Sequence, residues 1–322
     1  MIETIKQDCP PILFLIFNRP DVTYKVFERI REARPRQLYI AADGPRLNVP
    51  TDIEDCELAR QVVKLVNWDC EVQTLFRERN LGCKLGVRSA IDWFFEQVEA
   101  GIILEDDCLP SPDFFSYCAE LLERHKDHTQ ILSINGFNFG YHADGPFSYS
   151  FTHYFNMWGW ATWRRCARQI DYQMEEWGLV NKNWFLLRVL RSWFFDFDWK
   201  WIKHWRTIFD ELAKNSIDTW DYYWVYSGLK TGMFSIVPHR NLIKNIGFNN
   251  DATHTRDAGH PVAQLEADAI EIPIVHPIQV RRNRFYEEEY IKKIWHGYLR
   301  RPFYYQLWAF YRDVLRPESL LK

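Results

Sequence analysis

Over its first 135 residues the chain alternates short apolar runs with segments whose apolar residues recur at helical spacing. Short apolar runs predict buried strands. They lie at residues 11–17, 37–42, 71–76, 101–104 and 130–134. Helical spacing predicts helices at residues 21–33, 52–66, 86–99 and 113–124. Strands separated by single helices are typical of a mostly parallel sheet with helices on its faces, so we expect an α/β fold.

The second half of the chain is richer in aromatic residues and has fewer clear apolar runs. Residues 147–157 are consistent with a short hairpin, and residues 160–215 are predicted to be mostly helical. Residues 232–237 read as a further strand, and residues 245–259 as a loop containing several Asn, Asp and Thr.

Domain organisation follows from the absence of any repeat, low-complexity tract or Gly/Ser-rich linker. We expect one continuous domain over residues 1–260, in which residues 1–135 and 136–260 form two halves. A helical, aromatic-rich tail is expected at residues 261–322.

Composition limits the classes of partner. Of the 322 residues 47% are apolar and 26% are charged, which is typical of a globular protein. The net charge of −3 provides no basic field for capturing nucleic acid. Aromatic residues reach 17%, with 15 Trp and 16 Tyr. Such side chains suit sugar rings and interfaces, and core packing explains them equally well.

The sequence predicts a cytoplasmic protein. Its polar start lacks the basic and apolar regions of a secretory signal, and no apolar run reaches the ~18 residues of a membrane span. The seven Cys form no CxxC pair, which disfavours both a disulfide framework and a zinc site.

Polar residues follow several of the predicted strands. Ligands of parallel sheets bind at the carboxyl ends of the strands, a rule that points to Asn18, Arg19, Asp43 and residues 105–107. Three adjacent carboxylates repel one another unless a cation or hydrogen-bond donors face them. Carboxylate oxygens suit Mg²⁺ or Mn²⁺. The alternative is that the acids favour the start of the helix predicted at 113–124, through its dipole.

The segment from Ile102 to Tyr117, with Glu-Asp-Asp followed by Pro-Asp-Phe-Phe, resembles the metal-binding block of GT-A fold glycosyltransferases. It is most similar to that of the inverting N-acetylglucosaminyltransferase I family. Further similar blocks follow in the family's order, although Asn18 stands where that family has an Asp. They are residues 11–19, 42–44, 158–162, 220–224 and 247–255. Residues 18–20, 158–163 and 252–255 also resemble bacterial hemolytic-protein-like sugar transferases.

The resemblance implies roles for individual residues. Asp107 would bind the metal, with His254 as a second ligand, and Asp221 would be the general base. The residues implied in donor or nucleotide binding are Asn18, Arg19, Asp43, Arg79, Lys84, Glu105, Asp106 and Thr253. Those implied on the acceptor side are Trp158, Gly159, Trp160 and Trp220.

The implied activity is a metal-dependent, inverting transfer of a sugar from a UDP-sugar to a hydroxyl of a glycan or lipid-linked acceptor. Mn²⁺ or Mg²⁺ would be the cofactor, and N-acetylglucosamine the favoured sugar. In this interpretation residues 1–135 bind the nucleotide and residues 136–260 face the acceptor. A non-catalytic carbohydrate-binding protein is the alternative. A sugar-nucleotide nucleotidyltransferase is disfavoured because residues 18–21 contain no Gly-rich loop.

Other interpretations remain for single residues. Asp221 is equally placed to cap a helix, in which case Asp218 would be the functional acid. His254 is also consistent with a plain loop residue. Any one Trp is more often found in the core than in a sugar site.

The end of the chain is basic and aromatic. Residues 281–322 hold ten Lys or Arg against five acids, interleaved with Trp, Tyr and Phe. Helices of this kind lie at anionic membrane surfaces, which would bring the protein to the inner face of the membrane and to a lipid-linked acceptor. Packing back on the domain, or a homodimer contact, is the other interpretation.

Overall fold

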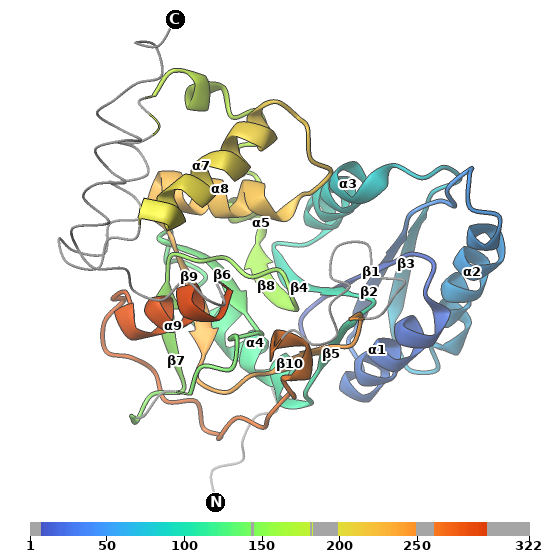
Figure 1. The fold of residues 1–322 in the computed structure, drawn as a ribbon. Helices are drawn as coiled ribbons and strands as arrows, with labels where there is room; N and C mark the ends of the chain where they lie inside the picture. The colour runs from blue at the N-terminus through green and yellow to red at the C-terminus, as the bar shows by residue number, and fades with distance from the viewer. Residues whose placement is uncertain (1–7, 143–144, 181, 183–198, 249–260, 295–322) are drawn as a thin grey trace, which may run out of the picture.

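The computed structural model describes residues 8–142, 145–180, 182, 199–248 and 261–294. Its centre is an eight-stranded sheet in the order β3-β2-β1-β4-β8-β6-β9-β7, flanked by helices (Figure 1). The strands of this sheet are β1 (Ile12–Ile16), β2 (Gln37–Ala42), β3 (Glu71–Phe76), β4 (Ala100–Glu105), β6 (Ile131–Asn135), β7 (Tyr149–Thr152), β8 (Trp160–Trp163) and β9 (Phe234–Pro238). A second, two-stranded sheet pairs β5 (Cys108–Pro110) with β10 (Ile243–Asn245).

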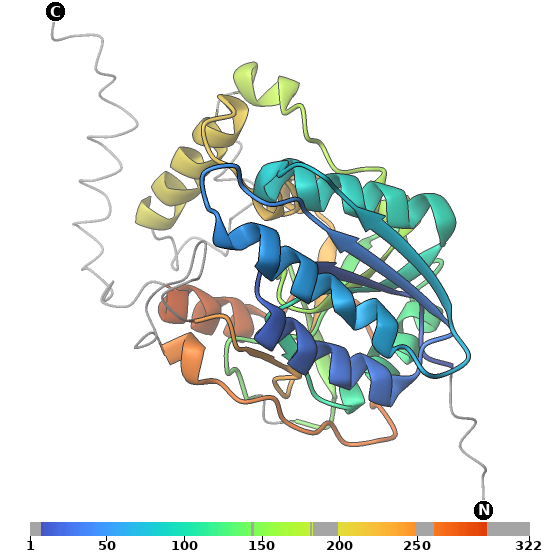
Figure 2. The same cartoon turned by 90° about the vertical axis from the view of Figure 1, so that its right-hand side faces the viewer.

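Helices flank the sheet (Figure 1). The α-helices are α1 (Pro20–Ala33), α2 (Thr51–Arg60), α3 (Gly82–Gln97), α4 (Asp113–Arg124), α5 (Arg164–Ala167), α7 (Trp199–Ala213), α8 (Asp221–Thr231) and α9 (Arg284–Ile294). The 3-10 helices are η1 (Gln61–Leu65), η2 (Glu175–Gly178) and η3 (Pro261–Gln264). Figure 2 shows α1 and α2 together on one side of the first strands and α3 on the other.

The first half of the chain folds as its pattern predicts. The strands β3, β2, β1 and β4 run parallel, and every residue of β1 is buried. Pro20 begins α1, where its missing N–H and fixed φ are favourable, and Val26, Phe27 and Ile30 of this helix are fully buried. The predicted strands and helices of residues 11–135, and with them the α/β class, are confirmed.

The second half corrects two predictions. Residues 160–163 are not helical: they form β8, which lies antiparallel between β4 and β6. Residues 147–157 form no hairpin, because β7 pairs antiparallel with the distant strand β9. The sheet is therefore mixed, with a parallel half and a half in which β8 and β7 run against their neighbours. All four side chains of β8 are buried, so no alternation marked it as a strand.

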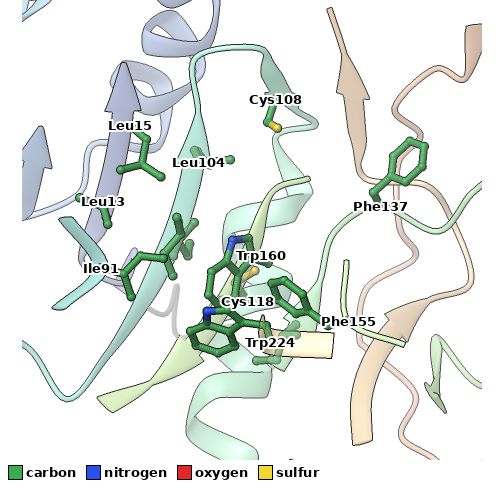
Figure 3. Close-up of a cluster of buried hydrophobic side chains, with 14 of the residues drawn as sticks. Leu13, Leu15, Ile91, Leu104, Cys108, Cys118, Phe137, Phe155, Trp160 and Trp224 are labelled. Atoms are coloured by element: carbon green, nitrogen blue, oxygen red, sulfur yellow. The ribbon is translucent and has the colours of Figure 1, made fainter. Parts of the chain in front are cut away.

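Aromatic side chains fill the core on the second half of the sheet. Trp160 packs edge-on against Trp224 and Phe155, with ring centroids 4.6 Å and 4.8 Å apart, and Figure 3 shows the three rings gathered next to Leu104 of β4. Much of the high Trp content is thus core, since three of the largest fully buried side chains are indoles.

The described part of the tail packs onto the domain. Tyr286 and Tyr290 of α9 are buried, and Glu287 accepts hydrogen bonds from Thr152 Oγ1 (3.0 Å) and the His153 N–H (2.8 Å). This agrees with the packing interpretation over residues 281–294, the described part of the segment 281–322, whereas residues 295–322 lie outside the described residues. Among the residues the structure describes, no helix has the length and apolarity needed to cross a membrane.

Candidate functional site

A cavity of about 960 Å³ opens at the carboxyl ends of β1, β2 and β4. From β1 the sheet continues to β2 and β3 on one side and to β4 on the other, so the strand order reverses at this point. Such reversal points are where open α/β sheets bind ligands, and the volume suits a ligand of drug size or larger. The cavity therefore lies at the carboxyl ends of the parallel strands, where a ligand site is expected from the sequence.

Most of the residues proposed from the sequence line this cavity. They are Asn18, Arg19, Asp43, Glu105, Asp106, Asp107, Trp158, Trp220 and Asp221. Four others do not belong to its described wall: Arg79, Lys84, Gly159 and Trp160. Thr253 and His254 lie outside the described residues.

The acidic triplet ends a buried strand. Glu105 is the last residue of β4, and burial, together with the charges of Asp107 and Asp106, raises its pKa well above the usual range. Asp106 is only 4% exposed; burial raises its pKa to about 6, although Arg19 opposes the shift. The fold holds these carboxyl groups together against their mutual repulsion.

One arginine faces two of the acids. Nη2 of Arg19 donates to Oδ1 of Asp106 and, over 3.0 Å, to Oδ2 of Asp107. Burial acts to lower the pKa of Arg19, but the attraction of the two carboxylates outweighs it and raises the pKa above its usual value. The second oxygen of Asp106, Oδ2, is buried with no hydrogen-bond partner among the described residues. The negative charge is only partly compensated by the described chain.

Asp107 is the candidate ligand for a divalent cation. A Cβ atom on Gly247 would lie 2.2 Å from Asp107 Oδ2, so only a glycine lets the backbone pack this closely against the carboxylate. Among the described residues no group of three His, Cys, Asp or Glu could hold a metal ion on its own. Mg²⁺ typically takes one or two carboxylates and completes its shell with water and substrate phosphates. Asp107 would be the protein ligand in such an arrangement.

A second acid–arginine cluster lies on the other side of the β1 end. Asp52, fully buried, accepts hydrogen bonds from Asn18 Nδ2 (2.8 Å), from Arg46 Nε (2.6 Å) and Nη2 (2.9 Å), and from the Arg46 N–H (3.0 Å). The hydrogen bonds of Arg46 lower the pKa of Asp52 to about 2. Arg46 also lines the cavity, a position that the sequence reasoning did not find, since the loop around it carries no motif.

Two aspartates of the cavity wall hold the start of α3. Asp43 accepts hydrogen bonds from the N–H groups of Leu81 (2.9 Å) and Gly82 (3.1 Å), and burial nevertheless raises its pKa. Asp218 accepts from the N–H groups of Cys83 (3.0 Å) and Lys84 (2.8 Å). Both carboxylates therefore cap the amino terminus of α3, by accepting from N–H groups that have no partner within the helix.

Asp221 has a different environment. It is the first residue of α8, is 7% exposed, and accepts a hydrogen bond from Thr219 Oγ1. An acid is favourable at this end of a helix. Its charge contributes to the raised pKa of Glu105, which places the two carboxyl groups in the same cavity although 116 residues separate them. Asp221 is thus both a helix-terminal acid and a member of the site.

The predicted acceptor-side residues divide between cavity and core. Trp158 is on the cavity wall and packs edge-on against Phe248, with centroids 5.7 Å apart. Trp220 lines the cavity and stacks on Trp160 at 5.9 Å, whereas Trp160 has no exposed surface. Gly159 has a φ of +59°, and a Cβ there would lie 2.4 Å from Ile243.

The basic loop after β3 presents Arg77 to the cavity. Arg77 lines the cavity and donates from Nη2 to Ser89 Oγ (2.7 Å). The Arg77 N–H extends the parallel ladder to the Ala42 carbonyl, which fixes its orientation. Lys84 turns away, with Nζ bonded to Asn215 Oδ1 at 2.6 Å, and Arg79 is exposed. The resemblance implied Arg79 and Lys84 in nucleotide binding, whereas Arg77 is the residue on the cavity wall.

Comparison with known proteins gives no family assignment, because no protein-family model and no curated protein matches the chain.

Proposed function

We propose that the chain is a metal-dependent, inverting glycosyltransferase of the GT-A type that moves a sugar from a UDP-sugar to an acceptor hydroxyl. One observation carries the proposal: the cavity at the strand-order reversal brings together Arg19, the triplet after β4, and Asp221 from a distant helix. These are the residues to which the sequence resemblance assigns nucleotide binding, metal binding and base catalysis.

The chemistry can be assigned to the residues of the wall. Arg19, with five N–H donors on a planar guanidinium, suits the oxygens of a diphosphate. Glu105 would accept hydrogen bonds from hydroxyl groups of the donor sugar. Asp106 would accept them from the hydroxyl groups of the ribose or from water. Mn²⁺ or Mg²⁺ held by Asp107 would supply positive charge to the leaving diphosphate.

Asp221 would act on the acceptor side. Inversion requires a base that takes the proton of the acceptor hydroxyl while the bond between sugar and diphosphate breaks. Asp221 lines the cavity together with Trp158, which is partly exposed and offers apolar surface for a sugar ring. Asp218 is less suited, because its carboxylate is engaged by two N–H groups of α3.

A purely sugar-binding protein is disfavoured by the acidic triplet at the end of β4. Burying Asp106 there with a raised pKa destabilises the fold, and sugar binding alone does not require it. Sugar-nucleotide binding and cleavage do require charge at this position.

The deciding experiment is a donor panel. The protein is incubated with UDP-, GDP- and TDP-sugars in Mn²⁺, in Mg²⁺ and in EDTA, and release of the nucleoside diphosphate is measured. We expect slow, metal-dependent hydrolysis of a UDP-sugar, with UDP-N-acetylglucosamine first in order. If no donor is cleaved and UDP does not bind with Mn²⁺ present, the protein is not a transferase of this type.

The proposal includes a cytoplasmic location and a glycan or lipid-linked acceptor at the inner face of the membrane. Residues 295–322, with the basic and aromatic end of the tail, would provide the membrane contact or a homodimer contact. Co-sedimentation with anionic liposomes at low salt, compared with a chain ending at residue 294, tests the membrane contact. Full-length protein that stays in the supernatant contradicts it.

A further inference from the structure

The backbone of Arg19 is held at the end of β1. Its side chain is 21% exposed, and its carbonyl accepts hydrogen bonds from the Thr23 N–H (3.0 Å) and Thr23 Oγ1 (2.7 Å) in the first turn of α1. Pro20 follows it and restricts the backbone further. The side chain therefore starts from a fixed point, from which its guanidinium reaches the acids at the end of β4.

Arg19 contacts the carboxylate to which the proposed function assigns the metal. Nη2 lies 3.0 Å from Asp107 Oδ2, and Asp107 lines the cavity. A cation bound to this carboxylate would lie close to the guanidinium. Because both carry positive charge and share one carboxylate, each weakens the binding of the other.

Arg19 also has donors to spare. The described contacts use Nη2, while Nε and Nη1 have no acceptor among the described residues. A guanidinium binds phosphate oxygens through two parallel N–H groups when it turns to them. A diphosphate entering the cavity would therefore offer Arg19 a second partner in exchange for Asp107.

We propose that Arg19 is a tethered counter-cation that competes with the divalent metal for Asp107 until a nucleoside diphosphate engages it. The metal then binds weakly to the protein alone and tightly together with the diphosphate. The inference rests on the proposed function, which assigns the metal to Asp107. An arginine whose only role is to bind the nucleotide predicts no change in the affinity for Mn²⁺ alone.

The test is a titration with Mn²⁺ in the absence of nucleotide, in which electron paramagnetic resonance of free Mn²⁺ gives the affinity. Arg19→Gln is expected to bind Mn²⁺ about tenfold more tightly than the wild type, equivalent to about 1.4 kcal/mol. Arg19→Lys keeps the charge and should remain close to the wild type. Arg77→Gln is the matched control, because it removes a cation of the same wall that contacts neither Asp106 nor Asp107.

A second pair of variants covers the case in which Arg19→Gln does not fold, since it leaves the buried Asp106 without its cation. Asp106→Asn is compared with the double variant Asp106→Asn/Arg19→Gln, and the double variant is expected to bind Mn²⁺ about tenfold more tightly. Equal or weaker binding after removal of Arg19, an effect of the same size in Arg77→Gln, or no Mn²⁺ binding by any of these proteins overturns the inference.

Repeating the titrations with UDP separates this inference from the proposed function. UDP should increase the Mn²⁺ affinity of the wild type more than that of Arg19→Gln. If UDP binds to none of the proteins, the proposed function fails while the nucleotide-free titration still decides the competition. If UDP and Mn²⁺ bind to the wild type but Arg19→Gln gains no Mn²⁺ affinity, only the counter-cation role fails.

Discussion

Two neighbouring residues at the end of β1 reach two very different aspartates. Asn18 donates to Asp52, which is fully buried, receives four hydrogen bonds and has a pKa lowered to about 2. Arg19 donates to Asp106, which is almost as deeply buried but has a pKa raised to about 6 and one oxygen without a hydrogen-bond partner among the described residues. Burial is similar in the two cases, and the supply of donors differs.

The difference separates an acid that holds the fold from an acid whose charge is only partly compensated. Buried polar groups are nearly always hydrogen-bonded, and a buried acid lacking donors destabilises the folded state. Asp52 meets the rule and fixes the loop that carries Arg46. Asp106 departs from it, at the edge of the sheet where α/β folds commonly bind ligands.

Removing Asp107, the proposed metal ligand, gives the largest expected effect on activity. Asp107→Ala should abolish Mn²⁺-dependent UDP binding and turnover, because the variant lacks the carboxylate that would hold the cation. Stability should hold or rise, since like-charge repulsion within the triplet decreases. Isothermal titration with UDP and Mn²⁺, together with thermal unfolding, checks both parts. Glu78→Ala, at an exposed acid, is the control; unchanged metal-dependent binding in Asp107→Ala contradicts the assignment.

The variant Asp221→Asn tests the proposed role of Asp221 as the general base. The amide keeps the size of the side chain but cannot take the proton, so turnover should decrease by about 10²- to 10⁴-fold while donor binding remains. Steady-state kinetics and UDP-sugar binding measure the two separately.

Asp218→Asn is its matched control. It should leave turnover within a few-fold and lower stability by about 1 kcal/mol, as expected for a weakened helix cap. Loss of turnover in Asp218→Asn alone would assign the base to that residue instead.

The comparison of the two aspartates predicts opposite signs for stability. Asp52→Ala leaves Asn18 and the partly exposed Arg46 without their acceptor and should lower the free energy of unfolding by about 1–2 kcal/mol. Asp106→Asn relieves repulsion and should leave the free energy of unfolding unchanged or higher. Urea unfolding at pH 7 measures both. A similar loss in the two variants would show that the two sites do not differ in this way.

Lowering the pH should reduce the contribution of Asp52 to the stability of the fold. Its folded pKa of about 2 lies below the unfolded value, so the ionised group stabilises the fold at neutral pH, and this contribution is lost as pH falls towards 2. Between pH 6 and pH 3 the stability difference between wild type and Asp52→Asn should shrink by about 1 kcal/mol. Urea unfolding of both proteins across this range checks the slope, and a difference independent of pH contradicts it.

Local pattern was sufficient for the first half of the fold and insufficient for the second. Strands such as β1 are buried on both faces and are joined by single amphipathic helices, so each unit is visible within about 30 residues. β8 is inserted between β4 and β6, and its place is set by distant partners. α8 was also missed, because nearly all of its side chains are buried and no polar face reveals its period.

Some residues of the candidate site could be located from local sequence, and others could not. Arg19, Asp43 and the triplet could be located because each directly follows a strand. Arg46 and Arg77 could not, since their approach to the cavity depends on Asp52 in the next helix and on the ladder of β2. Asp221 was found through resemblance, and no local signal distinguishes it from Asp218.

Two carboxylates of the chain already bind the N–H groups at the start of α3. The amides of the first turn of a helix commonly bind a ligand phosphate. Here the N–H groups of residues 81–84 are already bonded to the carboxylates of Asp43 and Asp218, which act as an intramolecular substitute for that phosphate. A diphosphate approaching α3 would meet two negative charges instead of open donors. Electrostatics therefore directs it across the cavity towards β1, and phosphate affinity should depend on the cations there and hardly on the helix dipole.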